Sequence, residues 1–187
     1  MKNFLCSVGN AAFKWYQNGA QLVESCAMVQ SVSVVIEIPK GSRNKYELDK
    51  DTGAIKFDRM LFSSVQYPTD YGFVPDTLAA DGDPLDALVL VWEATFPGCL
   101  IETKPIGVFK MRDEKGDDEK ILTVPVSDPL WNHLNCLADA PPHLIKEIEH
   151  FFSIYKDLEG KKVEIIGWEE KEEALKVIQE CKERFPG

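Results

Sequence analysis

The residues with the clearest chemical character are three aspartates within the six-residue segment Asp81-Gly82-Asp83-Pro84-Leu85-Asp86. They come just before an apolar stretch, residues 87–92, that has the length of a strand. Carboxylates this close together repel, and two that share a site normally force one of them to hold a proton. A divalent cation relieves that repulsion, because hard cations prefer several oxygen ligands. The segment predicts a metal site, and the alternative is a solvated acidic turn, since Asp-Gly and Asp-Pro are ordinary turn dipeptides.

A second acidic cluster, residues 113–120, has the sequence DEKGDDEK and links two expected strands. Taken alone, such a charge run is most often a solvated hairpin tip. Two acidic loops at the strand ends of one small barrel could nevertheless face the same mouth. That arrangement would suit a site with several metal ions, which clamp the attacking and leaving oxygens of a phosphoryl transfer.

Basic and phenolic side chains are scattered among these acids. Lys45 and Glu47 flank Tyr46 on an expected strand, so their side chains point to the same face of that strand. Surface salt bridges or half-buried packing are the ordinary explanations for side chains of these types. The remaining members of this group are Asp58-Arg59 near the end of a strand, Tyr67 and Tyr71 in an expected loop, and Tyr155-Lys156 on an expected helix.

Other phosphate-binding and hydrolase motifs are missing. The sequence contains no G-x-x-x-x-G-K-[ST], G-x-G-x-x-G, G-x-S-x-G or H-E-x-x-H motif. An EF-hand beginning at Asp81 is excluded, because Leu85 and Asp86 stand where that loop needs an oxygen ligand and a glycine. The three histidines, His133, His143 and His150, form no recognisable ligand set.

Short strands and two helices must position these residues. Strands are expected at 32–38, 46–49, 54–57, 87–93, 101–111, 119–126 and 162–168, with a hairpin turn at 50–53. Strands this short and this evenly spaced indicate a small closed or nearly closed β-barrel. One helix should begin near Pro141 and stop at Gly160, with an apolar face of Leu144, Ile148, Phe151, Tyr155 and Leu158. The last helix should run from about Glu170, with Ala174, Ile178, Cys181 and Phe185 on one face.

The chain has 187 residues and a net charge of −10, from 31 acidic and 21 Lys and Arg residues. This length suits one domain, and the acidic balance argues against nucleic-acid backbones and anionic membranes as partners. Residues 1–33 hold only three charged residues, so we expect a flexible or loosely docked extension, with Met28 as an alternative start. Five widely spaced cysteines without a C-x-x-C pair favour a reducing, cytoplasmic location.

The motifs together resemble those of soluble family I inorganic pyrophosphatases of the bacterial type. DGDPLDA at 81–87 resembles the family signature, and the resemblance extends over about residues 34–180 in the family's order and spacing. The supporting segments are VVIEIPKG at 34–41, NKYELD at 44–49, FDRM at 57–60, YPTDYGF at 67–73, KMRDEKGDDEK at 110–120 and HFFSIYKDLE at 150–159.

This resemblance implies a mainly β fold with α (α+β), a five-stranded OB-like barrel with two main C-terminal helices packed outside. A single catalytic domain, residues 34–187, would hydrolyse pyrophosphate to two phosphates with several Mg²⁺ ions, through a metal-activated water attacking one phosphorus in line. Its partners would be pyrophosphate and phosphate, and the chain would form a homohexamer. Bound Mg²⁺ could make the barrel mouth electropositive, so an acidic chain remains compatible with an anionic substrate.

The resemblance also implies a role for each matching residue. Asp83 would be the general base. The main metal ligands would be Asp81, Asp86, Asp113 and Asp118, with Glu37 and Glu47 supporting further ions. The phosphate-binding groups would be Lys45, Arg59, Tyr71, Lys120, Tyr155 and Lys156, and Tyr67 would line the site.

Two other functions have to be weighed. A non-catalytic OB-type module that binds oligonucleotides should carry a basic groove with stacking aromatic residues. A glycosidase that uses two carboxylates would need neither a metal nor the clustered Lys, Arg and Tyr side chains. Phosphate release from pyrophosphate, with Mg²⁺ and then with EDTA, separates these alternatives.

Overall fold

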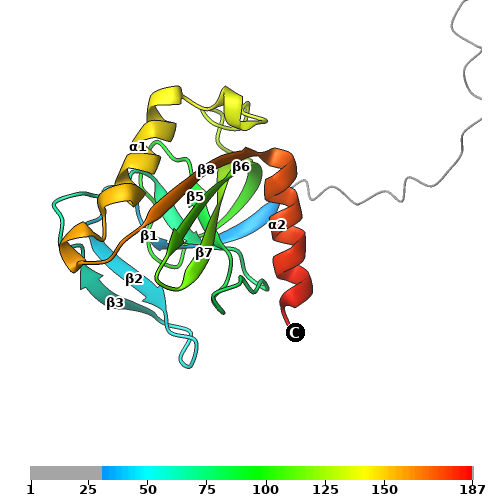
Figure 1. Ribbon diagram of the computed structural model, residues 1–187. Coiled ribbons are helices and arrows are strands. Elements are labelled where there is room, and N and C mark those ends of the chain that lie inside the picture. The colour runs from blue at the N-terminus through cyan, green and yellow to red at the C-terminus, as the bar shows by residue number, and fades with distance from the viewer. Residues whose placement is uncertain (1–30, 187) are drawn as a thin grey trace, which may run out of the picture.

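The computed structural model describes residues 31–186, which form a β-barrel with helices on its outside (Figure 1). None of the helices in this range is long and apolar enough to cross a membrane. In chain order the elements are β1 (Val32–Ile38), β2 (Asn44–Leu48), β3 (Ile55–Met60), β4 (Asp70–Phe73), β5 (Asp86–Val89), β6 (Leu100–Asp113), β7 (Gly116–Pro125), η1 (Leu137–Asp139), α1 (Pro142–Ile154), η2 (Asp157–Glu159), β8 (Glu164–Glu170) and α2 (Lys171–Arg184).

Five strands form a closed ring of hydrogen bonds in the order β1-β4-β5-β7-β6, and β6 returns to pair with β1. All of these pairings are antiparallel except that of β5 with β7. β6 is long enough to pair with two further strands. Its first residues pair with β1, which closes the ring, and residues 107–112 pair with β8. The expected fold class, a mainly β protein with a five-stranded barrel and two helices, is confirmed.

The barrel wall is apolar on both of its faces. Along β5, Leu88 belongs to the core cluster that packs on α1, whereas Ala87 and Val89 belong to the cluster that packs on α2. Successive side chains of a strand point to opposite faces, so an uninterrupted apolar run is what a strand covered on both sides requires. The run at 87–92 therefore reflects the position of β5 between two core clusters.

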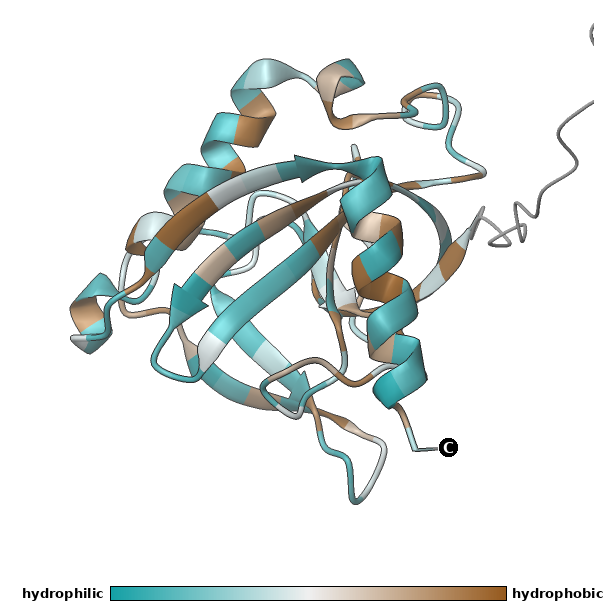
Figure 2. Cartoon of the chain, turned by 45° about the vertical axis from the view of Figure 1, so that its right-hand side comes forward, coloured by the Kyte–Doolittle hydropathy of each residue, from teal (hydrophilic) through white to brown (hydrophobic). Residues whose placement is uncertain are grey.

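The two C-terminal helices cover the barrel from different sides (Figure 1), and apolar residues recur along α2 between hydrophilic ones (Figure 2). The buried face of α2 includes Ala174, Ile178 and Cys181, as expected, but Phe185 was wrongly placed on it, since it follows the end of the helix and is exposed. The α1 prediction was too long, because the α-helix ends at Ile154 and η2 follows before Gly160, which has a φ of 71°. Leu158 was wrongly placed on the apolar face, since it is 68% exposed.

Tyr67 and Tyr71 were expected in one loop, residues 67–72, but the second half of that segment belongs to the strand β4. β4 has only four residues and lies between β1 and β5, where it is buried along its whole length. At Gly72 a Cβ atom would lie 1.9 Å from the Val35 carbonyl oxygen, so only glycine allows this approach of β1. A strand this short and interrupted by glycine has no alternation long enough to recognise in the sequence.

The other expected strands are present with bounds shifted at their ends. The 50–53 turn joins β2 to β3, and Gly53 takes the left-handed conformation with a φ of 70°. At the N-terminus, Val32 and Ser33 were counted both in the expected strand 32–38 and at the end of the expected extension, and the structure has them in β1. The rest of that predicted extension, residues 1–30, lies outside the described residues.

Candidate active site

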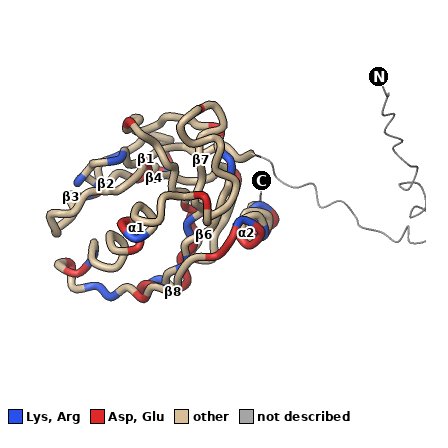
Figure 3. Tube along the Cα trace, turned by 90° about the horizontal axis from the view of Figure 1, so that it is seen from above, with Lys and Arg blue, Asp and Glu red and all other residues tan. Residues whose placement is uncertain are grey.

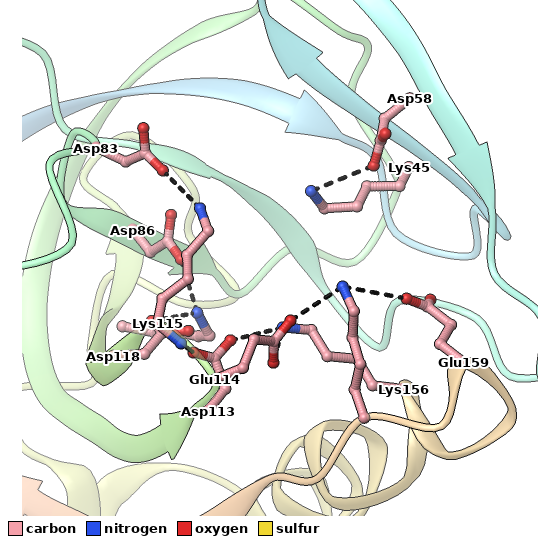
Figure 4. Close-up of polar contacts among 12 residues, drawn as sticks. Lys45, Asp58, Asp83, Asp86, Asp113, Glu114, Lys115, Asp118, Lys156 and Glu159 are labelled. Carbon is pink, nitrogen blue, oxygen red and sulfur yellow. Dashed lines mark hydrogen bonds and ion pairs between the residues drawn. The ribbon is translucent and has the colours of Figure 1, made fainter.

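A cavity of about 430 Å³ lies between the β2–β3 hairpin, the loop before β5, the β6–β7 hairpin and the segment after α1. Figure 4 shows Asp83, Asp86 and Asp118 around one side of an open space, with Lys45 and Asp58 on the opposite side. Tyr67 is the exception among the residues expected at the site, since all the others line the cavity: Glu37, Lys45, Glu47, Arg59, Tyr71, Asp81, Asp83, Asp86, Asp113, Asp118, Lys120, Tyr155 and Lys156.

The loop 81–86 presents its carboxylates through a tight turn. Gly82 has a φ of 87°, a left-handed conformation that favours glycine, and the Asp81 carboxylate accepts a hydrogen bond from the Asp83 backbone N–H at 3.1 Å. The Asp83 carboxylate is held between Lys50 Nζ at 2.8 Å and Lys115 Nζ at 3.2 Å. Burial alone would raise the pKa of Asp83, but the hydrogen bonds from these two lysines lower it below the ordinary value.

Lys120 joins one aspartate of each acidic cluster. The parallel register of β5 and β7 sets Asp86 opposite Lys120, and Lys120 Nζ donates to Asp86 Oδ2 at 2.6 Å and to Asp118 Oδ1 at 2.7 Å. The Tyr71 hydroxyl also donates to the Asp86 carboxylate. Burial raises the pKa of Asp86 against the opposing effect of Lys120, and Asp118 adds to the increase. Burial would lower the pKa of Lys120, but the two carboxylates raise it above its ordinary value.

The second acidic cluster lies on the β6–β7 hairpin and faces the same cavity. Asp113, at the end of β6, accepts a hydrogen bond from Lys156 Nζ at 2.6 Å, and its side chain is only 6% exposed. Burial raises the pKa of Asp113, but the stronger combined effect of Lys156 and the Lys115 backbone lowers it. Asp117 behaves as a solvated hairpin residue instead, because it pairs with Arg112 at 2.6 Å and is largely exposed.

The β2–β3 hairpin contributes the opposite wall. Lys45 and Glu47 lie on one face of β2, as their spacing predicts, and form an ion pair there, and Lys45 Nζ also lies 3.5 Å from Asp58 Oδ2. Glu37 projects from β1 to accept a hydrogen bond from the Leu48 backbone N–H at 2.7 Å. Burial raises the pKa of Glu37 to about 7, against this hydrogen bond, and the nearby charge of Asp86 adds to the increase.

Tyr67 lies behind the cavity wall. Its side chain is 2% exposed, and its ring centroid lies 5.5 Å from that of Tyr71 and 4.7 Å from that of Phe151. Burial raises the pKa of the Tyr67 phenol well above its ordinary value. In this structure Tyr67 supports the ring of Tyr71 from the α1 side, and it does not line the cavity.

Four further charged residues line the cavity that the sequence did not single out as site residues: Lys50, Glu114, Lys115 and Lys161. Glu114 and Lys115 lie inside the acidic cluster at 113–120, so their neighbours were a usable signal. Lys50 and Lys161 stand in turns where a lysine is ordinary. These two lysines line the cavity only because the tertiary structure packs their segments next to it.

The charges of the cavity are nearly balanced, with eight acidic and seven basic lining residues. Among residues 31–186, no group of three His, Cys, Asp or Glu side chains is close enough together to hold a metal ion. The donor set nevertheless fits Mg²⁺, which prefers carboxylate oxygens. The ammonium of Lys120 lies between Asp86 and Asp118, so these two carboxylates can share one cation.

Comparison with known proteins assigns the family. The family model described as inorganic pyrophosphatase matches residues 34–186. The inorganic pyrophosphatase of Methanosarcina acetivorans is 64% identical over 156 residues, covering 83% of this chain and 93% of that protein. That of Halalkalibacterium halodurans is 51% identical over 156 residues, with 83% and 96% covered. The crystal structure of the Thermus thermophilus inorganic pyrophosphatase superposes with a TM-score of 0.82 at 44% identity, covering 89% of this chain and 97% of that one. The chain therefore belongs to the family I inorganic pyrophosphatases, the enzymes that hydrolyse inorganic pyrophosphate.

Proposed function

We propose that this inorganic pyrophosphatase hydrolyses pyrophosphate to two phosphates with Mg²⁺, using Asp83 as the general base and the lysines of the cavity to bind phosphate. The observation that carries the proposal is the pairing of acids with bases around one cavity. The same cavity offers carboxylate oxygens to metal ions and ammonium groups to phosphate oxygens. A site for a metal-bound polyanion needs both kinds of group.

Asp81, Asp86, Asp113 and Asp118 would hold Mg²⁺, with Glu37 and Glu47 supporting further ions. When bound, Mg²⁺ supplies positive charge to the substrate oxygens and lowers the pKa of a bound water. Two features support this assignment. Burial raises the pKa of Glu37 and of Asp86, so a bound cation would favour the ionised form of both carboxylates. The Lys120 ammonium also marks a position where two aspartates share one cation.

Asp83 would accept the proton of the attacking water, provided that it lies within hydrogen-bond reach. Its carboxylate projects into the cavity on an exposed loop, where Lys50 and Lys115 are its partners. Both lysines are more than half exposed and can move away when the substrate enters. Asp83 then becomes a stronger base, because two neighbouring positive charges no longer favour its ionised form.

The phosphate-binding groups would stabilise the charge that develops on the transferred and leaving groups. Their arrangement on several elements allows contact with both ends of a pyrophosphate. Cations are contributed by Lys45, Arg59, Lys120 and Lys156, and hydrogen bonds by the hydroxyls of Tyr71 and Tyr155.

Phosphate release from pyrophosphate tests the metal dependence directly. With millimolar Mg²⁺ we expect rapid release, and with EDTA we expect the rate to fall to background. Undiminished release with EDTA would overturn the metal requirement while leaving the enzyme class intact. An absence of release with Mg²⁺ would instead favour a binding module of the same fold.

The family resemblance also supports proposals for the assembly and the location of the chain. We propose a homohexamer, and large exposed apolar side chains such as Phe57, Phe62, Trp92 and Phe96 support association of the chain. Sedimentation equilibrium of the full chain should return six times the monomer mass. A cytoplasmic location is supported by the unpaired thiols of Cys99, Cys136 and Cys181.

A further inference from the structure

Glu159 is a nearly buried acid just outside the cavity. It closes η2, the short 3-10 turn that follows Tyr155 and Lys156, and its side chain is only 7% exposed. It does not belong to the cavity lining. Figure 4 shows it on the segment after α1, close to Lys156. A carboxylate this deeply buried is costly unless it is paired.

The partner of Glu159 is Arg59 on β3, one hundred residues away in the chain. Arg59 Nε donates to Glu159 Oε1 at 2.9 Å, and Arg59 Nη1 donates to the carboxylate of Asp58. Lys161 is a weaker partner, since its Nζ lies 3.8 Å from Glu159 Oε2 but 2.9 Å from Glu114 Oε1. The main partner of the Glu159 carboxylate is therefore the guanidinium of Arg59.

Two carboxylates on different sides of a planar guanidinium fix its plane. An arginine side chain has several rotatable bonds, and its fork recognises a phosphate only in a suitable orientation. Arg59 lines the cavity with 24% of its side chain exposed. Because Glu159 holds Nε and Asp58 holds Nη1, the other guanidinium N–H groups remain for a ligand.

We propose that Glu159 is a positioning residue that orients Arg59 toward the phosphate of the substrate. The proposal rests on the proposed role of Arg59 as a phosphate-binding group. It also links two walls of the cavity. Glu159, on the turn that follows Lys156, orients the side chain of Arg59 on β3. The positions of Arg59 and Lys156 relative to each other are therefore set before substrate binds.

Kinetics of Glu159→Ala and Glu159→Gln with pyrophosphate and Mg²⁺ test this assignment. Glu159→Ala should lower kcat/KM about tenfold, the change expected from losing one charge-assisted hydrogen bond. Glu159→Gln keeps an amide oxygen that can accept from Arg59 Nε and should recover most of that loss. Asp157→Asn is the matched control, because Asp157 is exposed on the same turn, and it should leave kcat/KM unchanged.

A double-mutant cycle with Arg59→Lys separates positioning from a general structural role. Lysine has no Nε for Glu159 to hold, so adding Glu159→Ala to Arg59→Lys should lower kcat/KM by less than a further twofold. Independent, multiplicative losses would overturn the positioning role, as would a failure of Gln to restore activity in a variant that melts at the parent temperature.

The cycle also distinguishes failure of this proposal from failure of the proposed function. If Arg59→Lys lowers kcat/KM and Glu159→Ala does not, only the positioning role is overturned. If Arg59→Lys itself leaves kcat/KM unchanged, then Arg59 does not bind the phosphate and both statements fall.

Discussion

Lys120 illustrates how single residues set the properties of this cavity. Its side chain is 2% exposed, and two aspartates lie within hydrogen-bond distance of its ammonium. In the absence of metal, this one ammonium offsets repulsion between Asp86 and Asp118. The same ammonium is the group we assign to phosphate. Lys120 is thus expected to contribute both to stability and to substrate binding.

Replacement of Lys120 by methionine should destabilise the protein mainly when metal is absent. Breaking a buried pair typically costs about 3–5 kcal/mol, and we expect about 2–3 kcal/mol here because both aspartates keep some exposure. Millimolar Mg²⁺ should recover part of this loss, since a cation again lies near the carboxylates. Urea unfolding in EDTA and in Mg²⁺ measures both values.

Lys110→Met is the control for that experiment, because Lys110 pairs with Glu173 at 2.7 Å away from the cavity lining. Its effect should stay below about 1 kcal/mol, as for other partly exposed pairs. It should also be the same in EDTA and in Mg²⁺. Equal stability of Lys120→Met and the parent chain in EDTA would contradict the role given to Lys120.

Asp83→Ala should abolish most turnover while Mg²⁺ binding largely survives. Loss of a general base typically lowers the rate by about 10²–10⁴-fold. Steady-state kinetics measures the loss, and titration calorimetry with Mg²⁺ measures the retained binding. Asp51→Ala, at the exposed tip of the β2–β3 hairpin, should leave both unchanged. Near-normal activity of Asp83→Ala across pH would show that another group takes the proton.

Among the elements, β4 is needed to complete the ring of strands beside the cavity. It brings Tyr71 to the cavity, and it pairs with β1 on one side and β5 on the other. Asp70, buried at its start, accepts hydrogen bonds from the Lys40 and Thr95 backbone N–H groups. These contacts tie two neighbouring loops to the strand that carries Tyr71.

Gly72→Ala should therefore disrupt β4 far more than an ordinary glycine replacement. The new Cβ would lie 1.9 Å from a backbone oxygen of β1, so the two strands must separate and lose pairing. We expect a loss of about 3 kcal/mol or more, the range of severe overpacking. Thermal unfolding measures it.

Gly41→Ala serves as the comparison, because no atom lies within 4 Å of a Cβ built there and the strain comes only from its φ of 80°. A left-handed alanine typically costs about 1–2 kcal/mol. A smaller loss for Gly72→Ala than for Gly41→Ala would mean that the barrel yields easily at β4.

At the scale of the whole molecule, the net charge of −10 is a poor guide to the site. Acidic and basic residues are interspersed along β6, β8 and α2 (Figure 3). The cavity carries seven of the 21 Lys and Arg residues of the chain beside eight acids, so it is close to neutral before any metal binds. Cation binding would make it positive, which reconciles an acidic protein with an anionic substrate.

A chain that starts at Met28 should fold and hydrolyse pyrophosphate as the full chain does. The family match begins at residue 34, and the barrel is complete with β1 starting at Val32. Its melting temperature and kcat/KM, compared with those of the full chain at equal concentration, check this expectation. A large decrease in either value would show that residues 1–27 contribute to the catalytic domain.

The sequence by itself indicated thirteen of the residues that line the cavity and most of the elements. Local spacing was sufficient for β1, for the β2–β3 hairpin and for α2, because their alternation, turn residues and apolar face recur at fixed short intervals. The segment 81–87 and the segments around it indicated the family, because a pattern that fixes three aspartates and one proline is specific. The common face of Lys45 and Glu47 also followed from spacing alone.

Only the tertiary structure decided which of these residues meet. Four features depend on contacts between segments far apart in the chain. They are the pairing of β6 with β1, the burial of β4, the burial of Tyr67 behind the cavity lining and the Glu159–Arg59 hydrogen bond. Such contacts depend on the register and packing of every strand between them. A local pattern fixes the side of a strand on which a residue lies, but the closed ring of hydrogen bonds selects its partner.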